Sequence, residues 1–291
     1  QENMPETANS EKSRMMNKTA EYLVLQAASD IRDQHTKGAS VKQLRKIKEE
    51  TLEKLYKILV YHLGVPPEEF NWRYKNKNEE IIEQKYTPQQ FYKEVVGVDL
   101  KEYVTIFHHP VHPYNKYYQV KFRRNMADEP DMTFINLNID DLKTYTLKSL
   151  LDGQPVWFAA DVGWQMEREI GIMAEGIYQY DLLFGVNYEM SKAERIEYGV
   201  SAANHAMAFV GADTAAGEVS KWRIENSWGT DKGDKGYWTM YDNWYDNYVF
   251  TIIIHKRVLP QPVLAILKTK PTLLPTWEPL ARSVHEVGTA E

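Results

Sequence analysis

Two stretches of the sequence decide the fold: residues 204–211 read NHAMAFVG, and residues 222–229 read WRIENSWG. In the first, residues 206–212 form an apolar run with β-prone side chains, which is typical of a buried strand. Small and polar residues at 213–217 indicate a turn after this run. The second stretch then returns along the first, so the sequence predicts a β-hairpin.

Alternation along the returning strand determines which of its side chains share a face. Successive strand residues point to opposite faces, so Trp222, Ile224 and Asn226 are expected on one face. His205 and Asn226 can therefore meet at one end of the hairpin.

His205 and Asn226 are the candidate catalytic residues. A histidine is an effective general base only when its ring is held in one tautomer, and an asparagine oxygen accepting from the ring N–H does this without adding charge. The pair suits a thiol nucleophile, because a thiolate–imidazolium pair needs a stable imidazolium. Trp228 is the candidate supporting residue, since its indole can shield the His–Asn hydrogen bond from water.

Further short motifs extend the pattern beyond the hairpin. They are MPET at 4–7, NSE at 9–11, RMMN at 14–17, DVG at 161–163, GY at 236–237 and LPTWEP at 274–279. With the hairpin, they resemble the bleomycin hydrolase and aminopeptidase C family of papain-like cysteine peptidases over nearly the whole chain.

The resemblance implies an α+β fold of the papain-like type, with a helical insertion, an antiparallel β-rich lobe and a C-terminal arm that enters the active-site cleft. We expect the insertion at residues 1–100, the lobe with the catalytic His and Asn at 101–257, and the arm at 258–291. The resemblance also implies peptide substrates, a cytoplasmic location and assembly as a homohexamer.

The arm is also expected to set specificity. In the family, its terminal carboxylate receives the amino group of the substrate, which makes the enzyme an aminopeptidase. Relatives end near the position matched by Ala281, whereas residues 282–291 follow here. This extension is expected to weaken or alter aminopeptidase selectivity.

The composition contains no cysteine, so the chain carries no thiol nucleophile. A papain-like enzyme has its cysteine upstream of the histidine, after a glutamine that helps to form the oxyanion hole. We therefore expect the C-terminal portion of a cysteine aminopeptidase, inactive by itself and lacking the N-terminal part with the nucleophile. The alternative is a non-catalytic scaffold or binding protein with the peptidase fold, and the reading frame upstream of Gln1 would decide between them.

Charge and hydropathy exclude other classes of partner. The formal net charge of −6 argues against a general electrostatic hold on nucleic acid or on anionic membranes. No run of about 18 apolar residues predicts a membrane span. We expect no cofactor.

Three histidines lie close together at 108, 109 and 112, and imidazole is a common ligand for zinc and copper. Pro110 and Pro113 indicate an irregular extended segment, and no acidic or thiol residue stands beside the histidines in the sequence. We therefore expect a structural role for them and no metal.

Overall fold

The computed structural model describes residues 13–124, 126, 128–187 and 189–279. The motifs expected at 4–7 and 9–11 lie outside this part of the chain. The chain forms two compact units that divide between Val98 and Asp99. Among the described residues, no helix combines the length and apolar character needed to cross a membrane.

The first unit is built from a helical hairpin and a β-hairpin. Its elements are α1 (Arg14–Thr36), α2 (Val41–Leu63), β1 (Phe70–Lys75), β2 (Ile81–Tyr86), α3 (Pro88–Phe91) and a π-helical segment (Tyr92–Val96). Helix α2 begins with a capping box, in which Gln43 N donates to Ser40 Oγ and Ser40 N donates to Gln43 Oε1. The box satisfies two backbone N–H groups that a helix start leaves without partners.

The second unit contains one long sheet with short helices. Its strands are β3 (Tyr103–Phe107), β4 (Lys116–Val120), β5 (Thr133–Asn136), β6 (Val156–Ala160), β7 (Met166–Glu167), β8 (Ile172–Met173), β9 (His205–Ala215), β10 (Glu218–Glu225), β11 (Tyr237–Tyr241), β12 (Val249–His255) and β13 (Thr272–Leu274). Its helices are α4 (Ile139–Leu151), α5 (Tyr180–Phe184), α6 (Lys192–Glu197), α7 (Asp242–Tyr248) and α8 (Gln261–Ile266), with 3-10 turns at Leu100–Glu102 and Lys256–Val258.

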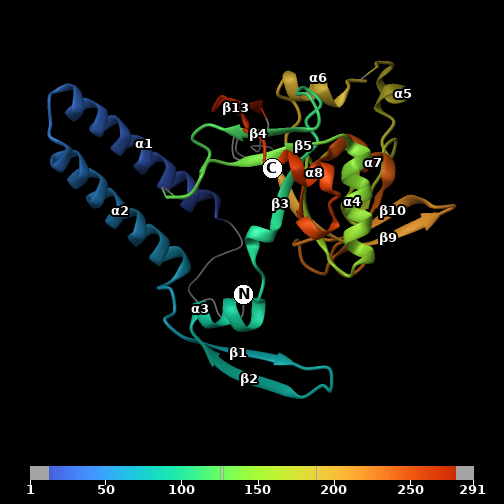
Figure 1. Cartoon of the computed structure of the whole chain (residues 1–291), viewed down its shortest axis with the longest axis horizontal. Coiled ribbons are helices and arrows are strands. Elements are labelled where there is room, and N and C mark those ends of the chain that lie inside the picture. The colour runs from blue at the N-terminus through green and yellow to red at the C-terminus, as the bar shows by residue number, and fades with distance from the viewer. Residues whose placement is uncertain (1–12, 125, 127, 188, 280–291) are drawn as a thin grey trace. The chain divides into compact units, whose positions relative to one another are not determined.

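The sheet order is β13-β4-β5-β3-β12-β6-β9-β10-β11-β8-β7. Most neighbouring strands are antiparallel, while β3 with β5, β4 with β13 and β8 with β11 are parallel. Helix α4 packs on β6, β9 and β12 in the middle of the sheet (Figure 1). The chain therefore combines separate helices with a mainly antiparallel sheet, which is the expected α+β class.

The core beneath the hairpin is aromatic. Phe209 of β9 stacks on Phe158 of β6 with ring centroids 4.0 Å apart, and its other neighbours include Trp222 and Tyr245. All four side chains are fully buried, and Trp222 Nε1 donates to Asp242 Oδ1 at 3.0 Å. This packing fixes the strands that carry the candidate site.

The hairpin differs from the expectation in the length of its turn. Strand β9 continues to Ala215, so the turn consists of two residues instead of five. Ala216 and Gly217 have φ angles of 54° and 90°, the left-handed conformation that a tight two-residue hairpin turn requires. Backbone pairing of β9 with β10 as far as Ala215 and Glu218 explains why the polar residues before the turn remain in the strand.

Candidate active site

His205 is the first residue of β9 and lies opposite Ala160, the last residue of β6. The side chain of Asn204 ties these strand ends together. Its Oδ1 accepts from Val162 N at 2.8 Å, and its Nδ2 donates to Asp161 Oδ1 at 2.8 Å. The backbone that carries His205 is thus held from a neighbouring strand.

Asp161 is a buried carboxylate that sequence reasoning noted only as part of a motif. Ser201 Oγ donates to its Oδ2 at 2.6 Å, while Asn204 donates to its Oδ1. Burial raises the pKa of Asp161 to about 6, although hydrogen bonds and the charge of Arg195 act in the opposite direction. A polar residue directly after the buried strand at 156–160 was the signal in the sequence.

His205 Nε2 and Asn226 Oδ1 lie 2.8 Å apart, so the structure brings the two candidate residues together. The same Oδ1 accepts from the backbone N–H of Ser227 at 2.8 Å. Because a backbone N–H can only donate, the atom facing His205 must be the amide oxygen, which can only accept. Nε2 of His205 therefore carries the proton, and Nδ1 is the free basic nitrogen of the neutral ring.

Trp228 covers this contact. Its ring stacks on the imidazole of His205 with centroids 4.6 Å apart and planes inclined by 29°. Trp228 also contacts the buried Trp238 edge to face, with ring centroids 5.3 Å apart. The guanidinium carbon of Arg168 lies 5.6 Å from the centroid of the Trp228 ring. The indole therefore covers one face of the imidazole that contacts Asn226.

Burial is the main influence on the titration of His205. It lowers the pKa of the imidazole below 6.5, while the hydrogen bond to Asn226 acts in the opposite direction and does not outweigh it. The ring is therefore neutral near pH 7, with Nδ1 able to accept a proton.

A β-bulge is needed for this geometry. Arg223 pairs with Gly211, but the next residue, Ile224, pairs with Phe209, so β9 contributes one extra residue at this point. Beyond the bulge, directly opposed residues share a face, which puts His205 on the same face of the hairpin as Asn226. Sequence alternation alone gives no sign of this irregularity.

Comparisons with known proteins identify the family. The sequence profile of the Peptidase C1-like family matches residues 1–281. Aminopeptidase C of Lactobacillus delbrueckii subsp. lactis is 36% identical over 282 residues, and bleomycin hydrolase of Mus musculus is 34% identical over 285 residues. Each alignment covers 95% of this chain and 63% of the relative.

A solved structure agrees with these relatives. The crystal structure of PepW from Lactobacillus rhamnosis HN001 matches with a TM-score of 0.90 and 36% identity, over 95% of this chain and 64% of that one. The chain thus spans somewhat less than two thirds of the length of the relatives it matches. With the fold, the sequence profile and these similarities in agreement, the chain belongs to the Peptidase C1-like family and has the α+β fold of papain-like peptidases.

Proposed function

We propose that the full-length protein is a papain-like cysteine aminopeptidase and that His205 and Asn226 are its catalytic base and orienting residue. The observation that carries the proposal is the 2.8 Å contact between His205 Nε2 and Asn226 Oδ1, beneath the stacked ring of Trp228. This contact leaves Nδ1 of a neutral imidazole as the proton acceptor. A thiol next to Nδ1 would lose its proton to the ring and become the nucleophile.

The chain contains no cysteine, so the nucleophile of this mechanism belongs to a part of the polypeptide outside these 291 residues. The relatives support this, because the chain covers only 63% of their length. By itself the chain is expected to be inactive.

The reaction follows from the roles of these groups. The thiolate attacks the carbonyl carbon of the first peptide bond. The imidazolium of His205 then donates its Nδ1 proton to the departing amine. The ring then takes a proton from water, which hydrolyses the thioester and releases the N-terminal amino acid. General acid–base catalysis of this kind typically contributes about 10² to 10⁴ in rate.

The same resemblance leads us to propose a cytoplasmic homohexamer. The surface of α2 supports assembly, because Leu52 and Leu59, which lie seven positions apart, are exposed on it. An apolar helix face of this kind is normally covered. Light scattering on the full-length protein would measure the assembly directly.

Hydrolysis of fluorogenic aminoacyl amides by the full-length protein tests the enzymatic proposal. We expect thiol-dependent turnover that iodoacetamide abolishes and that His205→Ala reduces by about 10² to 10⁴. His35→Ala is the matched control, since this histidine is exposed on α1. A folded full-length protein without thiol-dependent turnover would favour the non-catalytic scaffold instead.

A further inference from the structure

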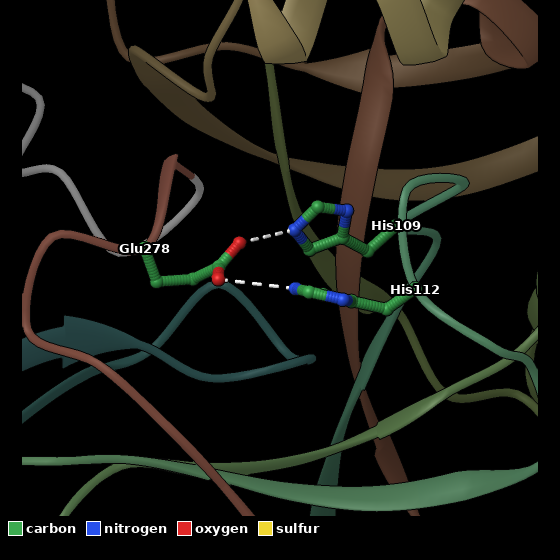
Figure 2. Close-up of side chains that lie close together, drawn as sticks. All are labelled: His109, His112 and Glu278. Carbon is green, nitrogen blue, oxygen red and sulfur yellow. Dashed lines mark hydrogen bonds and ion pairs between the residues drawn. The ribbon is translucent and has the colours of Figure 1, made fainter.

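A second cluster of titratable groups lies outside the candidate active site. His109 Nε2 contacts Glu278 Oε1 at 2.6 Å, and His112 Nε2 contacts Glu278 Oε2 at 3.0 Å (Figure 2). His109 is fully buried, Glu278 is 4% exposed and the side chain of His112 is 23% exposed. The sequence shows no acidic residue beside these histidines, but the fold brings Glu278 to them across 166 positions of the chain.

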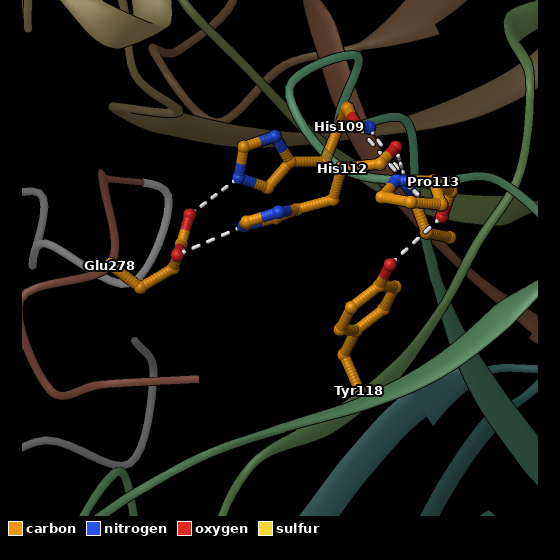
Figure 3. A network of polar contacts seen from close by, with 6 residues as sticks. His109, His112, Pro113, Tyr118 and Glu278 are labelled. Carbon is orange, nitrogen blue, oxygen red and sulfur yellow. Dashed lines mark hydrogen bonds and ion pairs between the residues drawn. The ribbon is translucent and has the colours of Figure 1, made fainter. Parts of the chain in front are cut away.

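The loop that carries both imidazoles is held rigidly. His109 N donates to the buried Asn136 Oδ1 at 2.8 Å, and Asn136 Nδ2 donates to the carbonyl oxygens of His109 and His112, each at 3.0 Å. Tyr118 OH donates to the carbonyl of Pro113 at 3.0 Å and closes the network below the loop (Figure 3). The backbone that carries the two rings is therefore held by contacts that do not involve Glu278.

Glu278 comes from the predicted C-terminal arm. Its N–H donates to the carbonyl of Pro275 at 3.1 Å, in a turn that directly follows β13. Strand β13 pairs with β4, which begins shortly after the histidine loop. The contact between the cluster and the arm therefore joins two segments that are far apart in the sequence.

Glu278 is a buried carboxylate that lies between two imidazoles. Among the described residues, no lysine or arginine forms an ion pair with Glu278. A buried carboxylate in this position favours an additional cation.

We propose that His109 Nε2, His112 Nε2 and the carboxylate of Glu278 bind a divalent transition-metal ion, with Zn²⁺ favoured by the ligand set. Two imidazoles and one carboxylate are a common set of three protein ligands for zinc, with water in the fourth position. The partly exposed side of His112 provides access for the ion and the water. The bound ion would fasten the arm to the sheet.

The geometry fits this ion after a small movement. The candidate ligand atoms all lie within 4.8 Å of one another. Tetrahedral zinc with ligands about 2.0 to 2.1 Å away needs neighbouring ligand atoms roughly 3.3 Å apart. Glu278 must move back slightly to admit the ion, and its flexible side chain on the arm permits this, whereas the histidine loop is fixed. Each imidazole would carry its proton on Nδ1 after binding.

The expected affinity is moderate. His109 Nδ1 is buried and has no hydrogen-bond partner within the described part of the chain. Metal-binding histidines usually donate this second N–H to an acceptor, and loss of such a partner lowers affinity about 10-fold to 100-fold. We therefore expect micromolar binding of one zinc ion per chain.

Zinc binding is measured on the full-length protein after removal of metals with EDTA, with any cysteines alkylated so that thiols cannot bind the ion. A titration with ZnCl₂ against a chromophoric chelator gives stoichiometry and Kd. We expect one site whose Kd rises about 100-fold in Glu278→Gln and in His112→Gln. His35→Gln, which changes an exposed histidine on α1, should leave the Kd unchanged.

Trypsin cleavage provides a readout that a simple loss of packing would not reproduce. Zinc should slow cleavage after the exposed Lys268 of the arm in the wild type but not in Glu278→Gln. Cleavage after the exposed Lys77, between β1 and β2, is the internal control and should not respond to zinc.

Absence of one-to-one zinc binding, or equal Kd values in the wild type and Glu278→Gln, would overturn the proposal. A dependence of Lys268 cleavage on pH but not on zinc would also overturn it, because a proton would then be the balancing cation. None of these measurements requires peptidase activity, so failure of the metal site and failure of the proposed function are distinguishable.

Discussion

Replacement of Asp161 by asparagine should change how the stability of the protein depends on pH. Asp161 is 5% exposed and accepts hydrogen bonds from Ser201 Oγ and Asn204 Nδ2. An asparagine of the same shape can keep both contacts, because its oxygen accepts from Asn204 and its NH₂ group donates to the hydroxyl of Ser201. The substitution removes the ionisable group and leaves the packing unchanged.

The magnitude follows from the pKa of Asp161, which burial raises from 3.8 to about 6. This difference corresponds to about 3 kcal/mol, at about 1.36 kcal/mol per pKa unit. The folded state holds the proton more tightly than the unfolded state does. The stabilising contribution is therefore fully present below pH 3.8 and is lost as the pH rises through about 6.

Urea unfolding of the full-length wild type and Asp161→Asn, followed between pH 4 and 7.5, measures this effect. The variant should match the wild type near pH 4 and exceed it by about 2 to 3 kcal/mol near pH 7. Asp30→Asn, an exposed substitution on α1, is the control and should give a difference independent of pH. A constant difference between wild type and Asp161→Asn across this range would refute the argument, since it would mean that Asp161 titrates normally.

Three further predictions concern other parts of the chain. In the full-length protein, Asn226→Ala should lower kcat about 10-fold to 100-fold, less than His205→Ala, because the base remains but its orientation is lost; a larger loss in the asparagine variant would reverse the assigned roles. Ser40→Ala should lower the free energy of unfolding by about 1 kcal/mol through loss of the capping box with Gln43, as measured by urea unfolding. Removal of all residues after Ala281 should raise kcat/KM for substrates with a free N-terminus relative to N-acylated ones, and an unchanged ratio would show that the extension does not influence selectivity.

Features set by neighbouring residues were predictable from the sequence. The capping box of α2 depends on Ser40 and Gln43, two side chains three positions apart, so a local sequence pattern is sufficient to specify it. Burial of Trp222 and Ile224 likewise follows from alternation within a single strand. Local rules are sufficient for both features.

Features that depend on contacts between distant segments were not predictable. Glu278 reaches the histidine loop only because β13 pairs with β4, and a parallel pairing of this kind leaves no periodic pattern in either segment. The absence of an acidic neighbour in the sequence therefore gave an incomplete account of His109 and His112. The role of Asp161 was missed for a related reason, because its partners Ser201 and Asn204 lie about 40 positions away.

Of the two irregularities in the pairing of β9 with β10, the bulge between Arg223 and Ile224 decides the chemistry that the strands can support. Without the bulge, regular pairing from Arg223 and Gly211 would place Asn226 opposite Ala208, and His205 would point to the other face of the sheet. The extra residue of β9 shifts the pairing by one position and restores a common face. Composition and motif spacing identify which residues form the candidate pair, but the bulge is what allows the imidazole and the amide to meet at 2.8 Å.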